Sequence, residues 1–180
     1  MMKPTNDDIK FLFEGNETDI DKFVNTHKQQ LDDSGIDYNE LEDLKNEDLD
    51  YQRQQIFAFL YAVAIDWREY DDEIVRLLAG MIHDEQVEAS GNDEGILVKY
   101  NGVEHQIKLS FSPADRYNTI RGFNKIIKEK YEARILSESF YSDTHTLLIL
   151  PNETWKALGQ QYPTQINEVF MVITETTDFP

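Results

Sequence analysis

The segment SFYSDTHTLLIL, residues 139–150, holds side chains that many enzymes use. Ser142 offers a hydroxyl nucleophile, Asp143 a carboxylate and His145 an imidazole, so the segment suggests hydrolysis or metal binding. A catalytic triad needs three groups that converge from different parts of the chain, with the base between nucleophile and acid. Residues this close in sequence cannot do so, and we expect a polar loop that leads into a buried strand.

Three side chains of the second half suggest an alternative ligand site. Asp143 and His145 would share one face of an extended backbone, about 7 Å apart. If His105 lies on a neighbouring strand, then His105, Asp143 and His145 together would suit a small-ligand binder or a hydrolase-like enzyme. A hydrogen-bonded core histidine is the alternative for His105, as it is for His27 at the edge of a helix.

The rest of the sequence contains no motif for catalysis or for a cofactor. The chain has no cysteine, which excludes disulfides, thiolate metal sites and a cysteine nucleophile. It also lacks HExxH, the calcium-loop pattern, GxSxG and the glycine-rich phosphate-binding motifs. We therefore expect no catalytic residue, no metal site and no cofactor, and we expect the protein not to be an enzyme.

The net charge of −18 is distributed unevenly along the chain. Residues 1–95 carry 25 acidic and 8 basic side chains, whereas residues 96–180 carry 10 and 9. A field of this sign repels nucleic acid and anionic membranes and attracts basic proteins. The N-terminal segment lacks the features of a secretion signal, so we expect a cytoplasmic protein. From the charge we expect a basic protein partner, without direct contact to nucleic acid or membrane.

The densest acidic stretch lies between residues 32 and 50, where nine carboxylates occur with a single lysine, Lys45. Such crowding is tolerated where a basic partner relieves the repulsion, so the stretch is a candidate recognition surface with tyrosines as aromatic anchors. A solvated surface kept for solubility is the alternative. The candidate partner-binding residues are Asp37, Tyr38, Glu40, Glu42, Asp43, Glu47, Asp48 and Tyr51.

In its small size, its acidity, its lack of catalytic motifs and its acidic aromatic stretch from Asp32 to Tyr51, the chain resembles two classes of inhibitor. One class is the immunity proteins that bacteria make against nuclease toxins, and the other is phage-type inhibitors that imitate nucleic acid. The resemblance implies a bacterial protein-binding inhibitor that covers a basic active site or nucleic acid channel by steric and electrostatic means.

The first half of the chain has the spacing of helices. Apolar residues recur three and four apart in the segments 18–35, 36–45 and 74–82, where Thr18 is the expected cap of the first helix and Asp32-Asp33-Ser34-Gly35 its end. The apolar run from Ile56 to Ile65 is too short to span a membrane and predicts a buried helix that extends to Trp67. We therefore expect about four helices over residues 1–88. If the surface from Ile56 to Trp67 faced another protein, the chain would be a helical adaptor or a subunit of a complex.

The pattern changes after the small and polar residues 89–95, which predict a linker. In residues 96–111, Asn101-Gly102 stands between alternating runs and predicts a two-residue hairpin turn. The turn fixes the facing pairs as Tyr100 and Val103, Val98 and His105, Ile96 and Ile107, with Lys99 and Glu104 on the outer face.

Residues 96–180 predict a ββαββαβ order. A helix is expected from the Ser112 cap and Pro113 to about residue 130, where Arg121, Lys125 and Lys128 could contact phosphate or form a solvated face. Strands are expected near 131–137, 145–150 and 169–174, with a helix from Asn152 to Gly159. The unbroken apolar runs LLIL and VFMVI predict central strands. The expected fold class is α+β: a helical region, then an antiparallel or mixed sheet of about five strands with helices packed on it, in two regions or one globule.

Overall fold

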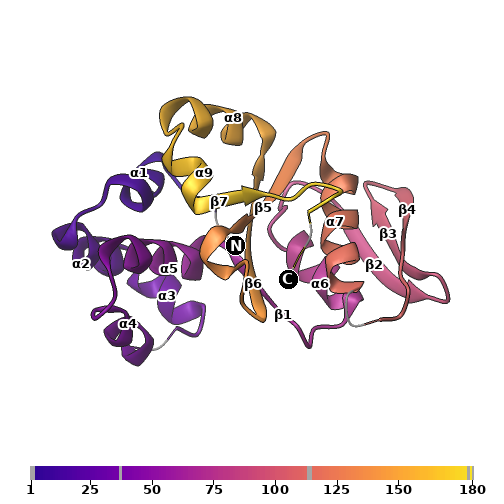
Figure 1. Ribbon diagram of the computed structural model, residues 1–180, viewed down its shortest axis with the longest axis horizontal. Coiled ribbons are helices and arrows are strands. Elements are labelled where there is room, and N and C mark those ends of the chain that lie inside the picture. The colour runs from indigo at the N-terminus through magenta and orange to yellow at the C-terminus, as the bar shows by residue number, and fades with distance from the viewer. Residues whose placement is uncertain (1–2, 37, 113–114, 178, 180) are drawn as a thin grey trace. The chain divides into compact units, whose positions relative to one another are not determined.

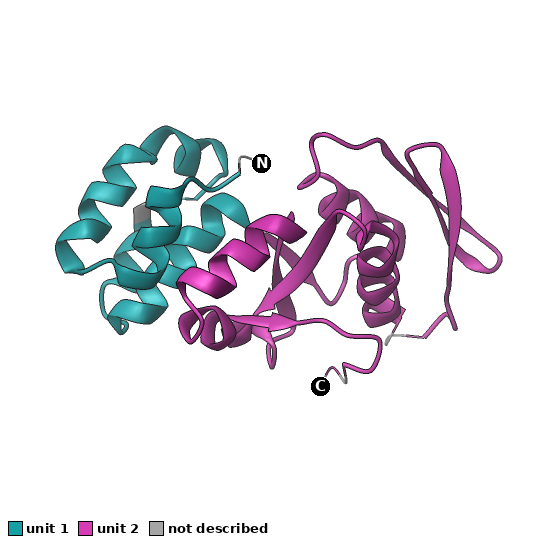
Figure 2. Ribbon diagram, turned by 90° about the horizontal axis from the view of Figure 1, so that it is seen from above, with its two compact units in different colours: residues 1–62 teal, residues 63–180 magenta. Residues whose placement is uncertain are grey.

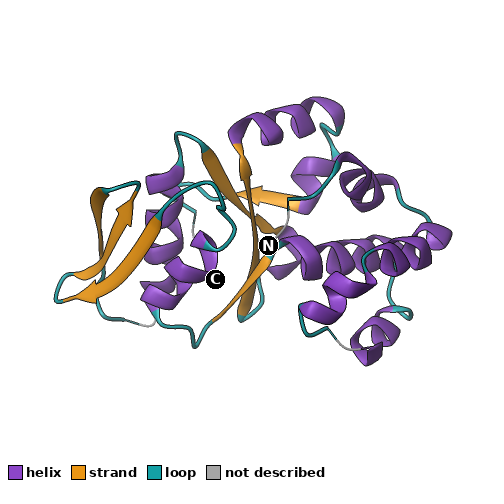
Figure 3. Cartoon of the chain, turned by 180° about the vertical axis from the view of Figure 1, so that it is seen from behind, coloured by secondary structure: helices purple, strands orange, loops and turns teal. Residues whose placement is uncertain are grey.

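The computed structural model describes residues 3–36, 38–112, 115–177 and 179 (Figure 1). It confirms the α+β class, with helices and two antiparallel sheets. The chain divides into two compact units, unit 1 (residues 1–62) and unit 2 (residues 63–180), which Figure 2 colours separately. In the described part of unit 1 every regular element is a helix, and the strands belong to unit 2 (Figure 3).

Unit 1 is built around its longest helix, α5 (Leu49–Tyr61). Three helices contact α5, namely α1 (Asn6–Glu14), α2 (Glu17–Thr26) and α3 (Lys28–Asp33), while α4 (Tyr38–Leu44) lies in the connection between α3 and α5. The buried apolar side chains of this core include Ile9, Leu12, Phe23, Leu31, Ile56, Phe57 and Leu60. Their removal from water is the main driving force for folding of the unit.

Capping boxes start the first two helices of unit 1. Thr5 caps α1, and the side chains of Thr5 and Asp8 each accept from a backbone N–H of the other. Asn16 and Asp19 do the same at α2, so the cap of this helix is Asn16 and not Thr18 as expected. Each box satisfies two backbone donors that a helix start leaves without an internal partner.

Unit 1 departs from the expected helices in three places. α1 is not predicted by the sequence pattern described above. The expected helix over residues 18–35 is two helices, because the chain turns at His27, although Gly35 at φ 78° does follow the end of the second one. The apolar run from Ile56 leaves the helix at Tyr61, and residues 63–66 form a strand.

Unit 2 contains two sheets rather than one sheet of about five strands. The first has the order β1-β6-β5-β7 and the second the order β2-β3-β4. The strands are β1 (Val63–Asp66), β2 (Val87–Asn92), β3 (Gly95–Tyr100), β4 (Val103–Lys108), β5 (Tyr131–Leu136), β6 (Thr144–Pro151) and β7 (Phe170–Val172). The helices are α6 (Asp71–Ala79), α7 (Asp115–Ile127), the 3-10 turn η1 (Ser137–Ser139), α8 (Asn152–Gln161) and α9 (Gln165–Val169).

Helices α6 and α7 contact each other and both sheets of unit 2, so they form a layer between the sheets (Figure 1). α8 packs on the first sheet, where the indole N–H of Trp155 donates to the Glu132 carbonyl at 2.8 Å. β6 lies between β1 and β5, and its residues 147–150 are all buried. The prediction of a central strand at LLIL is therefore confirmed.

The hairpin of β3 and β4 has the predicted register. Asn101 and Gly102 adopt φ values of 51° and 84°, as a two-residue turn with positive φ at both positions requires. The paired residues are Tyr100 and Val103, Lys99 and Glu104, Val98 and His105, and Ile96 and Ile107. Turn chemistry and alternation act locally, which is why this element could be predicted in detail.

Three other expectations for unit 2 need correction, and a fourth is not tested. The expected linker, residues 89–95, lies in β2 and the turn after it, and Glu88 pairs with Lys99 across β2 and β3. β7 is an edge strand, so VFMVI is not central. α8 continues through Gly159 instead of ending there, and Pro113 of the expected helix start lies outside the described residues.

β1 and β2 were both missed for the same physical reason. β1 pairs with β6, with Val63 opposite Leu147, and β2 pairs with β3. The partner strand, not the local sequence, supplies the backbone hydrogen bonds that make these segments extended. An apolar run or a polar run alone does not reveal such a partner.

Gly122 sets the approach of α7 to β4, because a Cβ atom there would stand 2.8 Å from a side-chain carbon of the buried Ile107. We expect Gly122→Ala to lower the free energy of unfolding by about 1–3 kcal/mol through overpacking. Gly159→Ala is the matched control, because no atom lies within 4 Å of its added Cβ and helix propensity should raise stability by about 0.5–1 kcal/mol. Urea titration of both variants measures the two effects, and a stabilised Gly122→Ala would contradict the tight contact.

Candidate functional sites

The polar residues before His145 form the entrance to β6, as expected. His145 is fully buried, and its Nδ1 lies 3.0 Å from the Ser139 carbonyl oxygen. Its ring packs against Tyr117 and Phe179, with centroid distances of 5.6 and 5.4 Å. Nε2 is buried without a hydrogen-bond partner among the described residues. The imidazole thus packs against aromatic rings and is closed off from solvent.

The alternative ligand site is not assembled. His105 is half-buried on β4 of the second sheet, whereas His145 lies on β6 of the first sheet, so the expectation of neighbouring strands is wrong. Asp143 is exposed in the loop before β6, where its backbone carbonyl accepts from Arg116 at 2.8 Å. The three side chains therefore do not converge on one ligand.

The acidic segment 32–50 extends over the end of α3, all of α4 and the start of α5. Of the candidate partner-binding residues, the exposed ones are Glu40, Asp43, Glu47 and Asp48, and the half-buried ones are Glu42 and Tyr51. Asp37 lies outside the described residues, as does the side chain of Tyr38, which begins α4. The chain therefore presents at least four carboxylates of this segment to solvent.

Few cations neutralise the segment. Lys45 pairs with Glu42, and Arg53 pairs with Asp50. In the part of the chain that the structure describes, Asp43 and Glu47 form no ion pair. Asp48 accepts from the Tyr51 N–H at 2.9 Å and so caps α5, which fixes its position at the surface.

A hydrogen-bonded cluster around Asp8 lies in the core of unit 1. One carboxylate oxygen of Asp8 accepts from the N–H and hydroxyl of Thr5, both at 2.7 Å, and from the Tyr61 hydroxyl at 2.8 Å. The other oxygen lies 3.0 Å from His27 Nε2. Asp8 itself is only 4% exposed. A buried carboxylate remains charged when donors and an opposite charge surround it in this way.

These contacts determine the protonation states of Asp8 and Tyr61. Burial alone would raise the pKa of Asp8, but the hydrogen bonds from Thr5 and Tyr61 and the charge of His27 outweigh burial and hold the pKa below its usual value. Burial and the hydrogen bond to Asp8 raise the pKa of the Tyr61 hydroxyl. Asp8 is therefore the anion of the cluster, and Tyr61 is a neutral donor at physiological pH.

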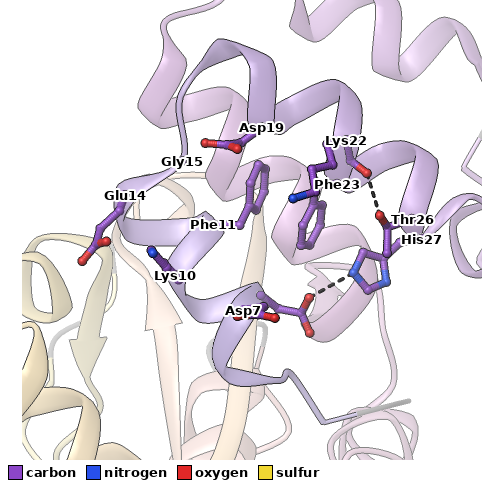
Figure 4. Close-up of a pocket in the computed structure, with 11 residues that line it drawn as sticks. Asp7, Lys10, Phe11, Glu14, Gly15, Asp19, Lys22, Phe23, Thr26 and His27 are labelled. Carbon is purple, nitrogen blue, oxygen red and sulfur yellow. Dashed lines mark hydrogen bonds and ion pairs between the residues drawn. The ribbon is translucent and has the colours of Figure 1, made fainter.

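A hollow of about 390 Å³ lies between α1 and α2 beside this cluster. Figure 4 shows the rings of Phe11 and Phe23 facing each other in it, and they are stacked with centroids 3.8 Å apart. His27 lies at one end, next to Phe23, with Asp19 and Lys22 among the charged residues around the hollow.

The cluster connects helices and does not offer a free base. His27 Nδ1 lies 2.5 Å from the Gln30 side-chain oxygen, and Nε2 is bonded to Asp8, so both ring nitrogens are engaged. A general base needs a nitrogen within reach of a ligand proton. The prediction that His27 is a hydrogen-bonded core histidine is thus confirmed.

The sequence patterns did not predict a role for the other members of this cluster, Thr5, Asp8 and Tyr61. The spacing of Thr5 and Asp8 is a capping signal, which a search for helix starts could have found. Tyr61 lies 53 residues from Asp8, and no local pattern joins them. Only the packing of α5 against α1 brings the two side chains together.

In the described ranges, no group of three or more histidine, aspartate or glutamate side chains could hold a metal ion. No helix of this part of the chain has the length and apolarity that crossing a membrane requires. Comparisons of the chain with models of protein families, with curated proteins and with solved structures give no match.

We expect His145→Phe to remove a pH dependence of stability in unit 2. Burial lowers the pKa of His145 below its usual 6.5, so the unfolded state binds the proton more tightly than the folded state. Stability is therefore complete above pH 6.5 and is lost as the pH falls toward the folded pKa. Both tryptophans, Trp67 and Trp155, lie in unit 2, so their fluorescence in urea titrations follows this unfolding.

The exposed His83 provides the control for this experiment. His83→Gln should keep the wild-type pH profile, whereas the His145→Phe profile should be flatter between about pH 7 and 5. Parallel profiles of the wild type and His145→Phe would show that the buried imidazole does not cause the dependence.

We expect Asp8→Asn to destabilise unit 1 by about 3 kcal/mol at neutral pH, because an amide cannot accept from all of these donors and His27 loses its carboxylate partner. The pKa of Asp8 is lowered in the folded state, so its contribution is present above the unfolded pKa, about 4, and is lost as the pH falls through the folded value. The stability difference between wild type and variant should thus shrink in acid. Helical circular dichroism during urea titration measures it, and exposed Asp7→Asn should be nearly neutral.

Proposed function

We propose that this protein is a non-catalytic inhibitor of a basic protein, of the immunity-protein type, with a nuclease toxin of the bacterial cytoplasm as the kind of partner it neutralises. The observation that carries the proposal is the exposure of Glu40, Asp43, Glu47 and Asp48 on α4 and in the turn after it. Carboxylates on a fixed surface attract a cationic partner and reject anionic competitors.

The charge of unit 1 supports this proposal. Residues 1–62 hold 15 acidic and 6 basic side chains, which is a high excess for so short a segment. Like charges at a surface destabilise the folded state by mutual repulsion, and a cationic partner relieves that repulsion on binding. Long-range attraction between the acidic surface and a basic partner raises the association rate, and this effect is strongest at low salt.

The position of Tyr51 adds an anchor beside the carboxylates. Tyr51 is half-buried in the first turn of α5, and Asp48 bonds to its backbone N–H. A tyrosine that is already partly packed loses little conformational freedom on binding, and tyrosine is frequent among residues that dominate interface energies. Tyr51 and the four exposed carboxylates together form the proposed inhibitory surface.

Two other functions fit the contacts less well. A helical adaptor would use the apolar surface from Ile56 to Trp67. Ile56, Phe57 and Leu60 are buried, whereas Trp67, in the turn after β1, is exposed, so this run offers one large side chain and not a continuous apolar face. An enzyme at the sheet would need His105 and His145 in one pocket, and they lie in different sheets. The inhibitor proposal uses only groups that reach solvent.

The test is a variant that neutralises the inhibitory surface by Glu40→Gln, Asp43→Asn, Glu47→Gln and Asp48→Asn. Asparagine still caps a helix, so Asp48→Asn preserves α5. The wild-type chain first captures its partner from the native host, which a salt gradient releases and mass spectrometry identifies. The variant should then bind the purified partner about tenfold more slowly at low salt, as measured by surface plasmon resonance.

A second variant loses the same number of charges elsewhere, through Glu88→Gln, Asp93→Asn, Glu104→Gln and Glu153→Gln, all exposed in unit 2. It should retain most of the wild-type association rate. Equal rates in the two variants would mean that only the net charge matters. An unchanged rate in the first variant would refute the inhibitory surface.

A further inference from the structure

A second hollow, in unit 2, differs in charge from the rest of this acidic chain. Its volume is about 330 Å³, which lies within the range of about 300–1,000 Å³ for small-molecule sites. Three cations line it: Arg121 and Lys125 from α7 and Lys128 just beyond the helix end. Residues spaced by four and three lie on one side of a helix, which is why these cations gather.

The positive charge of this hollow is only partly neutralised. Its two carboxylates each have a cation, since Glu132 pairs with Arg134 at 2.8 Å and Glu175 pairs with Lys125 at 2.9 Å. Arg121 donates to the carbonyl oxygen of Thr177 and to the side-chain oxygen of Asn118, which are neutral groups. Lys128 forms no ion pair within the described ranges. Arg121 and Lys128 therefore keep their charge available.

The walls of the hollow are held in place by hydrogen bonds. The Asn124 side-chain oxygen accepts from the Ala133 N–H at 2.8 Å, and its amide N–H donates to the carbonyls of Ala133 and Ile173 at 3.4 Å. The Asn152 amide donates to the Lys128 carbonyl at 2.9 Å. β5, the end of α7 and the chain after β7 are thus joined around the hollow, so a ligand would meet a preformed site.

The lining also offers groups for an uncharged part of a ligand. Tyr131 and Ile173 are buried, and Thr174 is exposed with its hydroxyl hydrogen-bonded to the hydroxyls of Thr176 and Thr177. A site lined by both cations and apolar side chains suits an anionic group carried on a small organic molecule.

We propose that this hollow binds the phosphate group of a small phosphomonoester through Arg121, Lys125 and Lys128. Guanidinium and ammonium groups bind phosphate oxygens by charge-assisted hydrogen bonds. On binding, Lys125 exchanges the Glu175 carboxylate for the phosphate. The acidic surface elsewhere repels a polymer of phosphates, which favours a small ligand over nucleic acid. This site is independent of the proposed inhibitory function.

The test is a titration of the full-length protein with ribose 5-phosphate and, separately, with inorganic phosphate, followed by amide shifts in ¹H–¹⁵N NMR spectra at constant ionic strength. Saturable shifts around residues 121–132 and 173–175 are expected with one or both probes. Lys128→Gln should raise Kd about fivefold, because it removes one nearby charge. Glu175→Gln should lower Kd by a similar factor, because it removes the competing carboxylate.

The two variants should change Kd in opposite directions, which distinguishes a specific site from general electrostatic attraction of phosphate to the protein. Lys108→Gln removes an exposed cation of β4 and should leave Kd unchanged. Tighter binding with ribose 5-phosphate would identify an organic phosphate as the ligand, and equal binding would identify phosphate alone. No saturable shift with either probe, or the same weakening in Lys108→Gln as in Lys128→Gln, would overturn the proposal.

Discussion

A buried carboxylate must be surrounded by donors, and this constraint organises unit 1. Asp8 satisfies it with groups from three places: Thr5 before α1, His27 at the end of α2 and Tyr61 at the end of α5. The contact with Thr5 belongs to the cap of α1 itself, whereas the contacts with His27 and Tyr61 tie α1 to the ends of α2 and α5. Hydrophobic burial drives the unit to collapse, but it does not select this arrangement, because apolar contacts have no direction.

The difference between contacts among sequence neighbours and contacts between distant segments explains what could be predicted from the sequence. The hairpin at Asn101-Gly102, the strand entrance before His145 and the central strand at Leu147 to Leu150 each leave a signal in neighbouring residues, and all three predictions were correct. β1, β2 and the Asp8 cluster depend on partners far along the chain, and they were missed. Exposure of the acidic segment could be expected from its composition, and the cap of α5 at Asp48 and the pair of Glu42 with Lys45 each join residues only three apart in sequence.

Charge has different roles in the two units. In unit 1 most of the described acidic side chains of α4 and its flanks face solvent, and the buried acid Asp8 is matched by donors and by His27. In unit 2 the cations beside α7 form a positive hollow in a chain whose net charge is −18. The aromatic enclosure of His145 has neither role, since burial keeps this imidazole neutral and away from any ligand. In so charged a chain, charged residues indicate a binding site only where the fold gathers side chains of one sign.

The three-stranded sheet carries a row of alternating charges, with Lys99 of β3 between Glu88 of β2 and Glu104 of β4. β2 and β4 each hydrogen-bond to β3 alone within this sheet, so each has a backbone edge that no strand covers in the described structure. Such edges are the usual starting points for aggregation, because another chain can extend the sheet. Here a second copy that approached either edge would bring glutamate against glutamate. Opposite charges side by side favour pairing within the sheet, while like charges at its two edges disfavour the addition of a strand from another copy.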